Sequence, residues 1–174
     1  MPAQRPALVL PAKQNYKKMN KLFSKNIRFN IAAVLLVAIF FIADRYLKIL
    51  AIQNYSENSQ NLIGEWLSFT FTPNYYIAFS LPLSGSILNI LLILIIIGLI
   101  VWIAKTIQQR ESLLLSFGLL VILLGAISNF LDRMAYGYVV DYLYLKYFTV
   151  FNLADVGISS GAILALIGLN KKPS

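Results

Sequence analysis

The sequence lacks the two residue types that carry much of enzyme chemistry, cysteine and histidine. Without cysteine the chain has no disulfide, no thiolate nucleophile and no cysteine-ligated zinc or iron–sulfur site. Without histidine it has neither the usual general base nor the commonest transition-metal ligand. Proton chemistry must therefore come from Asp, Glu, Lys or Tyr. The carboxylates are few: Asp44, Glu57, Glu65, Glu111, Asp132, Asp141 and Asp155.

Charge is also scarce, since 13% of the 174 residues are charged and 59% are hydrophobic. Soluble domains are usually about 25% charged and about 45–50% apolar, so the composition excludes an ordinary soluble enzyme. Four apolar stretches approach the ~20 residues that cross a bilayer. They cover residues 31–52, 87–104, 113–131 and 152–169. The sequence therefore predicts an all-α membrane protein with four transmembrane helices.

The basic residues predict the orientation of these helices. Seven of the fifteen precede the first apolar stretch: Arg5, Lys13, Lys17, Lys18, Lys21, Lys25 and Arg28. A basic segment directly before a hydrophobic helix indicates membrane topology rather than nucleic-acid binding. We therefore expect both termini in the cytoplasm, with a basic N-terminal tail over residues 1–30, a four-helix transmembrane domain over 31–169 and a short cytoplasmic tail over 170–174. Met19 is an alternative start.

This topology places four aspartates toward the outer face of the membrane, namely Asp44, Asp132, Asp141 and Asp155. Ionisable groups within or beside spanning helices are costly and usually functional, although ion pairing at a helix end is an alternative for any single one. Asp44 and Lys48 are four residues apart, so on a helix they share a face and can pair.

The outer loops contain a pattern typical of strands. Leu67, Phe69 and Phe71 alternate with polar residues, which predicts a short strand that ends at Pro73. The segment 139–151, rich in valine and aromatic residues, could pair with it. The two segments predict a small extracytoplasmic β-sheet, with an interfacial aromatic belt as the alternative.

Helical spacing relates several polar residues to one another. Asn129 lies three residues before Asp132 at the outer end of the third helix. Asn152 and Asp155 share the first turn of the fourth helix, where the helix dipole helps to keep a carboxylate charged. Asp141 has no such help among valine and tyrosine, so we expect its pKa to rise. Two carboxylates in unequal environments suit acid–base hydrolysis.

Four segments, taken in order, resemble the bacterial lipoprotein signal peptidases (signal peptidase II) over residues 31–169. They are Asp44-Arg-Tyr-Leu-Lys48, Asn74-Tyr-Tyr-Ile-Ala-Phe-Ser80, the pair Gly125–Arg133 and Gly137–Asp141, and Phe151-Asn-Leu-Ala-Asp155. The last two are specific, because N-x-x-D-R, G-x-V-V-D and F-N-x-A-D follow one another across the junction of the third and fourth helices. The first is weak by itself.

The resemblance implies an intramembrane aspartyl endopeptidase of the bacterial inner membrane, with its active site at the extracytoplasmic face. It would remove the signal peptide from diacylglyceryl-modified prolipoproteins, just before the lipidated cysteine. It would act as a monomer among membrane lipids, without cofactor, metal or nucleic acid. By matching positions, the catalytic dyad is Asp141 and Asp155. The substrate-binding or supporting residues are Asn74, Asn129, Arg133, Asn152 and Ala154, with more structural roles for Asp44, Lys48 and Asp132.

The chain departs from the family pattern at four positions. Tyr76 replaces a usual glycine, Ile77 a small residue and Ser128 the glycine before Asn129, while Leu47 stands where threonine is common. Tyr76 is the largest change, because a bulky ring replaces a flexible position beside the substrate. Since the dyad and its neighbouring motif residues are retained, we expect activity.

Three other functions fit parts of the sequence. A non-catalytic paralogue could bind lipidated peptides without cutting them, which the altered 74–80 segment favours. A proton-relay carrier should have its charges nearer the bilayer midplane. A metal-dependent protease is disfavoured, because four scattered aspartates without histidine suit Mg²⁺ or Ca²⁺ at best.

Gly157 and Gly161 form a G-x-x-x-G spacing that suits helix packing within the bundle or dimerisation.

Overall fold

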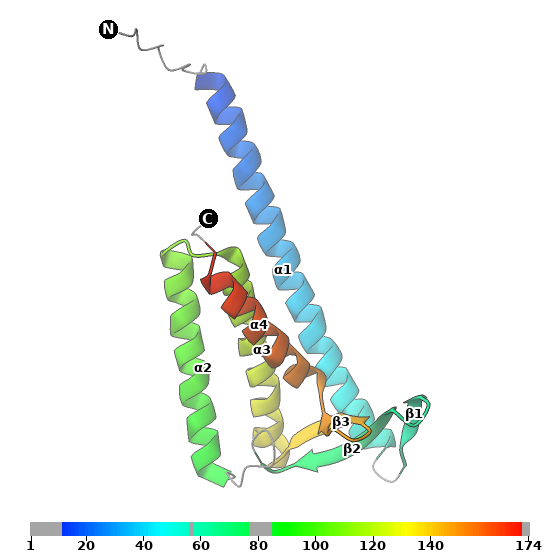
Figure 1. The fold of residues 1–174 in the computed structure, drawn as a ribbon. Coiled ribbons are helices and arrows are strands. Elements are labelled where there is room, and N and C mark those ends of the chain that lie inside the picture. Colours follow the sequence, from blue (N-terminus) through cyan, green and yellow to red (C-terminus); the bar gives the residue numbers. More distant parts are fainter. Residues whose placement is uncertain (1–11, 56–57, 77–84, 172–174) are drawn as a thin grey trace, which may run out of the picture. The chain divides into compact units, whose positions relative to one another are not determined.

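The computed structural model describes residues 12–55, 58–76 and 85–171, with side chains from residue 31 onward. Its helices are α1 (Ala12–Asn54), α2 (Gly85–Gln108), α3 (Leu113–Tyr136) and α4 (Leu153–Leu169) (Figure 1). The chain forms two compact units, residues 1–36 and 37–174. The first contains the start of α1, which begins at Ala12 within the segment expected to be a basic tail. The second contains the remaining elements and all contacts described below.

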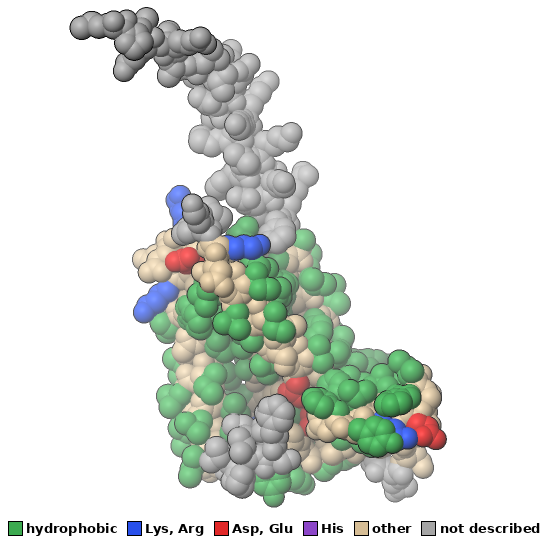
Figure 2. Space-filling model, in the orientation of Figure 1, with side chains coloured by type: hydrophobic (Ala, Val, Ile, Leu, Met, Phe, Trp, Pro, Cys, Tyr) green, Lys and Arg blue, Asp and Glu red, His purple; other side chains and the backbone are tan. Residues whose placement is uncertain are grey.

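Within the described part of the chain, two helices are long and apolar enough to cross a membrane. These are α2 and α3, with mean hydropathies of 3.1 and 2.3. Only 6% of the apolar window of α2 is buried, so its side chains face outward as in a lipid-exposed helix (Figure 2). Helix α4 is apolar but has 17 residues, and α1 carries three charged residues in its apolar stretch. Four spans remain a prediction.

The predicted pairing of the outer segments is confirmed by a four-stranded antiparallel sheet. Its strands are β1 (Gln60–Ile63), β2 (Leu67–Asn74), β3 (Val139–Leu145) and β4 (Val150–Phe151), in that spatial order. Strand β2 continues one residue beyond Pro73, which pairs with Val140 close to the strand end. Proline is tolerated near a strand end because few ladder hydrogen bonds are lost there. The helical membrane fold therefore carries the small sheet that the sequence predicted.

A hydrophobic cluster fixes the sheet against the end of α1. Ala51 of α1 packs with Phe69 of β2 and with Val140 and Tyr142 of β3. The rings of Phe69 and Tyr142 lie 5.4 Å apart between centroids. Because Val140 and Tyr142 are both fully buried, the residue between them, Asp141, is held at a fixed position on β3.

Close backbone contact joins α3 to α4. A Cβ atom at Gly118 of α3 would lie 2.6 Å from the carbonyl oxygen of Gly161 and 2.6 Å from the nitrogen of Ala165, both on α4. A Cβ at Gly161 would in turn approach Gly118 and Ile122. A Cβ at Gly157 would lie 2.9 Å from the ring of Phe40 and 3.6 Å from Val121. The G-x-x-x-G spacing is therefore used for packing within the bundle.

We expect Gly118→Ala to lower the thermal unfolding midpoint in detergent, because backbone atoms of α4 cannot turn away from the added methyl. Overpacking of this kind costs about 1–3 kcal/mol. The matched control is Gly98→Ala on α2, where an added Cβ meets no atom within 4 Å. The control should match or slightly exceed the wild-type midpoint, since alanine is the better helix former. Equal midpoints for the two variants would contradict the close α3–α4 contact.

Candidate active site

The structure brings the four outer aspartates into one polar cluster where α1, α3, α4 and β3 meet. Asp44 and Asp132 share the ammonium group of Lys48, and Asn152 contacts both Asp141 and Asp155. The carboxylates of Asp44, Asp132 and Asp141 are buried, whereas Asp155 is half-buried. Acidic atoms are visible between the helices and the sheet in Figure 2. Of the other carboxylates, Glu65 and Glu111 lie elsewhere and Glu57 is outside the described residues.

Asp155 is held at the first turn of α4 by a reciprocal cap. The N-cap residue, Asn152, accepts a hydrogen bond from the Asp155 N–H through its side-chain oxygen at 2.9 Å. Its own N–H donates to Asp155 Oδ2 at 3.3 Å. This is a capping box, and the helix dipole at this end favours a negative charge. Asn152 and Asp155, three residues apart in the sequence, therefore share the first turn of α4 as predicted.

Asp141 sits on β3, and among the described residues its hydrogen-bond donors are two neutral amides. Asn152 Nδ2 donates to Oδ1 at 2.6 Å, and Asn74 Nδ2 donates to Oδ2 at 2.9 Å. Burial, followed by the charge of Asp155, raises the pKa of Asp141 to about 7, against the opposing effect of the two amides. The predicted rise is confirmed, so this carboxyl group can hold a proton near neutral pH.

Asn129 links the cluster to Asp155. Its side-chain oxygen accepts from Lys48 Nζ at 2.8 Å, and its Nδ2 donates to Asp155 Oδ1 at 2.8 Å. An ammonium group can only donate, so Lys48 must face the amide oxygen. The amide nitrogen is thereby directed at Asp155. A buried cation on α1 thus sets the orientation of a hydrogen bond between α3 and α4.

Lys48 is fully buried, and its three protons have three close oxygen acceptors. These are Asp132 Oδ2 at 2.7 Å, Asn129 Oδ1 at 2.8 Å and Asp44 Oδ2 at 3.1 Å. Arg45 forms a second ion pair with Asp132. The two cations therefore match the two anions, as a buried charge cluster requires. The predicted pairing of Asp44 with Lys48 is confirmed.

Three residues of the cluster were missed by the sequence analysis as site residues: Arg45, whose ion pair is described above, Ser128 and Tyr142. The hydroxyl of Ser128 donates to Asp44 Oδ2 at 2.6 Å, and the Tyr142 hydroxyl donates to Asp44 Oδ1 at 2.9 Å. Burial raises the pKa of Tyr142, so its phenol stays protonated and remains a donor. Ser128 was visible only as a departure from a family glycine. Tyr142 was indistinguishable from the other tyrosines of its segment.

Arg133 and Asn74 hold the segment that carries the largest departure from the family. Arg133 donates to the carbonyl oxygens of Tyr75 at 3.4 Å and Tyr76 at 2.6 Å. Asn74 Oδ1 accepts from the N–H of Tyr76 at 3.1 Å. The contacts are made by the backbone of Tyr76, whereas its side chain is exposed. Ile77 and the rest of the motif to Ser80 lie outside the described residues.

Ala154 completes the contacts around Asp44. It is buried, and its N–H donates to Asp44 Oδ1 at 3.1 Å. Within the described ranges, no group of three or more acidic side chains is arranged to hold a metal ion. The cluster thus contains one carboxylate at a helix N-terminus and a second with a pKa near neutrality, and Asn152 contacts both.

The chain is similar to known proteins in sequence and in fold. A family model described as signal peptidase (SPase) II matches residues 36–171. The lipoprotein signal peptidase of Chlorobium phaeobacteroides is 34% identical over 152 residues, which cover 79% of this chain and 94% of that protein. That of Caldicellulosiruptor bescii is 37% identical over 124 residues, covering 71% and 81%. A solved bacterial membrane enzyme at 2.3 Å resolution superposes with a TM-score of 0.69 at 25% identity, covering 82% and 93%.

The fold and the site define a helical membrane enzyme with a small antiparallel sheet beside its buried carboxylates. The chain belongs to the signal peptidase II family. Family membership implies a bacterial membrane protease of lipoprotein processing, which is the class that the sequence motifs predicted.

We expect Lys48→Met to destabilise the fold strongly, because it leaves the buried Asp44 without a cation. Asp132 would keep Arg45 as its partner but lose Lys48. Removing one partner of a buried ion pair costs about 3–5 kcal/mol. The matched control is Lys146→Met, which breaks the exposed Lys146–Glu65 pair and should cost about 0–1 kcal/mol. Thermal unfolding in detergent measures both, and similar midpoints for the two variants would contradict the buried-cluster interpretation.

Proposed function

We propose that the chain is an aspartyl endopeptidase that removes the signal peptide from diacylglyceryl-modified prolipoproteins, cutting just before the lipidated cysteine. One observation carries the proposal: Asn152 is hydrogen-bonded to Asp141 through its side chain and to Asp155 through its capping box. Two carboxylates in contact with one rigid residue, one at a helix N-terminus and one buried on a strand, form an acid–base pair. The names of the relatives support the substrate class.

In the proposed reaction Asp155 is the base and Asp141 the acid. Asp155 accepts a proton from a water molecule while the water oxygen forms a bond to the scissile carbonyl carbon. Asp141 then donates its proton to the amide nitrogen, and the carbon–nitrogen bond breaks to leave a carboxyl group and an amine. The amides of Asn74, Asn129 and Asn152 hold the two carboxyl groups in place.

The remaining predicted residues are assigned supporting roles. Arg133 holds the backbone of the 75–76 segment beside the substrate. Asp44, Lys48, Asp132 and Ala154 maintain the buried network beneath the dyad. We also propose a monomer in the bacterial inner membrane with four spanning helices, cytoplasmic termini and the dyad at the extracytoplasmic face. The outward-facing apolar side chains of α2 support the membrane location.

Cleavage of a diacylglyceryl-modified prolipoprotein by the purified chain tests this function. We expect Asp141→Asn and Asp155→Asn each to lower the rate by about 10²–10⁴, the usual contribution of a positioned acid or base. Glu111→Gln makes the same carboxyl-to-amide change in the turn between α2 and α3, away from the candidate site, and should retain the wild-type rate. A wild-type chain that binds the substrate without cutting it would leave the non-catalytic binding protein as the better description.

The pH dependence of kcat/KM distinguishes the acid from the base. Because the pKa of Asp141 lies at about 7, Asp141 holds its proton below that pH and loses it above. We expect kcat/KM to fall about tenfold per pH unit above about pH 7, since the acid is then ionised. A value that instead rises through pH 7 would make Asp141 the base and reverse the assignment.

Stability gives an independent check of the same group. The folded-state pKa of about 7 exceeds the ~3.9 of an unfolded aspartate, so the stabilising contribution of the neutral form is complete below about pH 3.9 and is lost as the pH rises through 7. The Asp141→Asn variant cannot ionise. The unfolding midpoint of the variant minus that of the wild type should therefore increase between about pH 4 and about pH 7 and stay constant above pH 7. A constant difference would show that Asp141 is not perturbed.

A further inference from the structure

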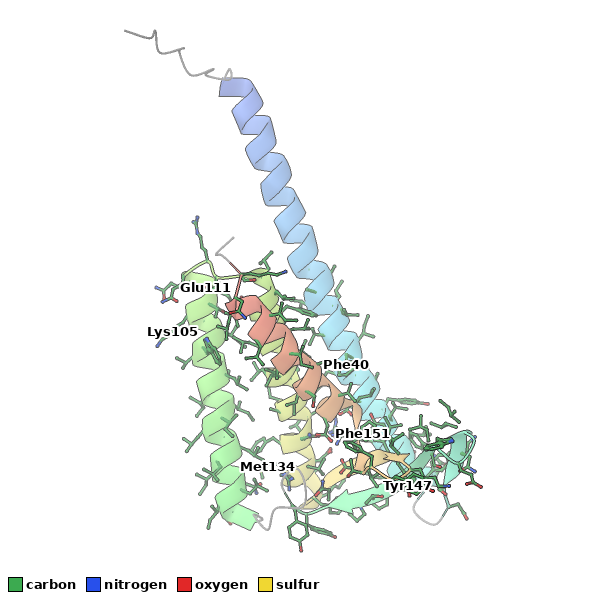
Figure 3. All side chains as sticks on the ribbon, viewed as in Figure 1. Phe40, Lys105, Glu111, Met134, Tyr147 and Phe151 are labelled. Carbon is green, nitrogen blue, oxygen red and sulfur yellow. The ribbon has the colours of Figure 1, made fainter. Side chains whose placement is uncertain are left out.

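Two turns at one end of the sheet expose large apolar side chains that neither the core nor the candidate site uses. Ile63 is the last residue of β1, Trp66 lies in the β1–β2 turn, and Tyr147 and Phe148 lie in the β3–β4 turn. Their exposed fractions are 63%, 61%, 83% and 70%. We call these four residues the aromatic tip. Tyr147 is labelled at the sheet in Figure 3.

The two turns of the aromatic tip are tied to each other. The N–H of Lys146 donates to the carbonyl oxygen of Trp66 at 2.9 Å, and its ammonium group pairs with Glu65 Oε2 at 2.6 Å. The rings of Trp66 and Tyr147 meet edge to face at 6.0 Å. The apolar side chains are therefore presented by an ordered pair of turns. In the described part of these turns the two charged side chains, Glu65 and Lys146, neutralise each other.

We propose that the aromatic tip inserts into the headgroup region of the membrane that holds the helices and anchors the sheet there. A cluster of exposed large apolar side chains marks an interaction surface. Trp and Tyr are enriched at the membrane–water interface, where the ring lies in the acyl boundary and the polar N–H or O–H reaches the headgroups. The outward-facing apolar side chains of α2 place a lipid surface around this same unit, and a neutral Lys–Glu pair adds no charge that would select an ionic partner.

The anchor would act on the dyad through two strands. Strand β2 starts beside Trp66 and ends at Asn74, and strand β3 starts near Asp141 and ends beside Tyr147. Their pairing runs from Leu67–Leu145 at the tip to Thr72–Asp141 at the site. The six residues of β2 from Leu67 to Thr72 therefore place the tip about 20 Å from the site. Fixing the tip in the interface would thus set the depth of Asp141, a consequence that rests on the proposed function.

Depth-dependent fluorescence quenching tests the insertion without requiring activity. The chain has two tryptophans, so Trp102→Phe leaves Trp66 as the reporter, and Trp66→Phe leaves Trp102 of α2 as the reference for a lipid-exposed site. Both variants are reconstituted into phosphatidylcholine–phosphatidylglycerol vesicles that carry bromine near the headgroup or deep in the acyl chain. We expect Trp66 to be quenched by the shallow bromine more than by the deep one, and to resist aqueous acrylamide.

Two outcomes would overturn the proposal. If acrylamide quenches Trp66 as fully as it quenches free tryptophan amide and brominated lipid does not, the tip lies in water. If Trp66 resists both quenchers while Trp102 responds to lipid, the tip is covered by protein, such as a second copy of the chain, rather than by lipid.

Cleavage in the same vesicles tests the consequence for the dyad. The triple variant Trp66→Ser, Tyr147→Ser and Phe148→Ser should cut a diacylglyceryl-modified prolipoprotein about tenfold more slowly, equivalent to ~1.4 kcal/mol. The single variant Trp66→Phe, which keeps an apolar ring and leaves Tyr147 and Phe148 in place, should cut at a rate near that of the wild type. An unchanged rate in the triple variant would show that anchoring does not position the dyad. A wild type that does not cut would contradict the proposed function while leaving the fluorescence result intact.

Discussion

The ammonium group of Lys48 is the interaction on which the rest of the site depends. It enters the protein interior on α1, and its three protons reach Asp44, Asp132 and the side-chain oxygen of Asn129. A buried cation without such partners would cost several kcal/mol, so α1 and α3 must meet in this register for the chain to fold. Because Asn129 can offer the cation only its oxygen, its nitrogen is left to bind Asp155.

Asn152 has the corresponding role on the sheet side. Its backbone and side chain close the cap of α4 around Asp155, while its Nδ2 reaches Asp141 on β3. The start of a helix and the middle of a strand are thereby held together by one residue. The close packing of α3 on α4 at Gly118 and Gly161 keeps Asn129 within reach of the same helix start. The spacing between the two proposed catalytic carboxyl groups is set by helix packing and by one side chain.

Local features of the fold and site could be predicted from the sequence. The apolar stretches, the Asn152–Asp155 cap and the Asp44–Lys48 pair follow from spacing along one helix, and the alternation after Leu67 predicted a strand. Contacts between distant elements could not be predicted in this way. The hydroxyl of Ser128 meets Asp44 across 84 positions of the chain, and that of Tyr142 meets it across 98. Nothing in the local pattern distinguishes either residue from a packing residue.

The arrangement also explains why Asp141 can hold a proton beside so many cations. Lys48 makes its direct ion pairs with Asp44 and Asp132, and Arg45 makes its own with Asp132, not with the proposed dyad. Arg133 is directed at backbone carbonyl oxygens of Tyr75 and Tyr76. Within the described ranges, Asp141 accepts hydrogen bonds from the neutral amides of Asn74 and Asn152, which orient it without a full opposing charge. A cation in direct contact would lower its pKa and remove the proton that the proposed mechanism requires, so the two structural aspartates serve to keep the positive charges occupied elsewhere.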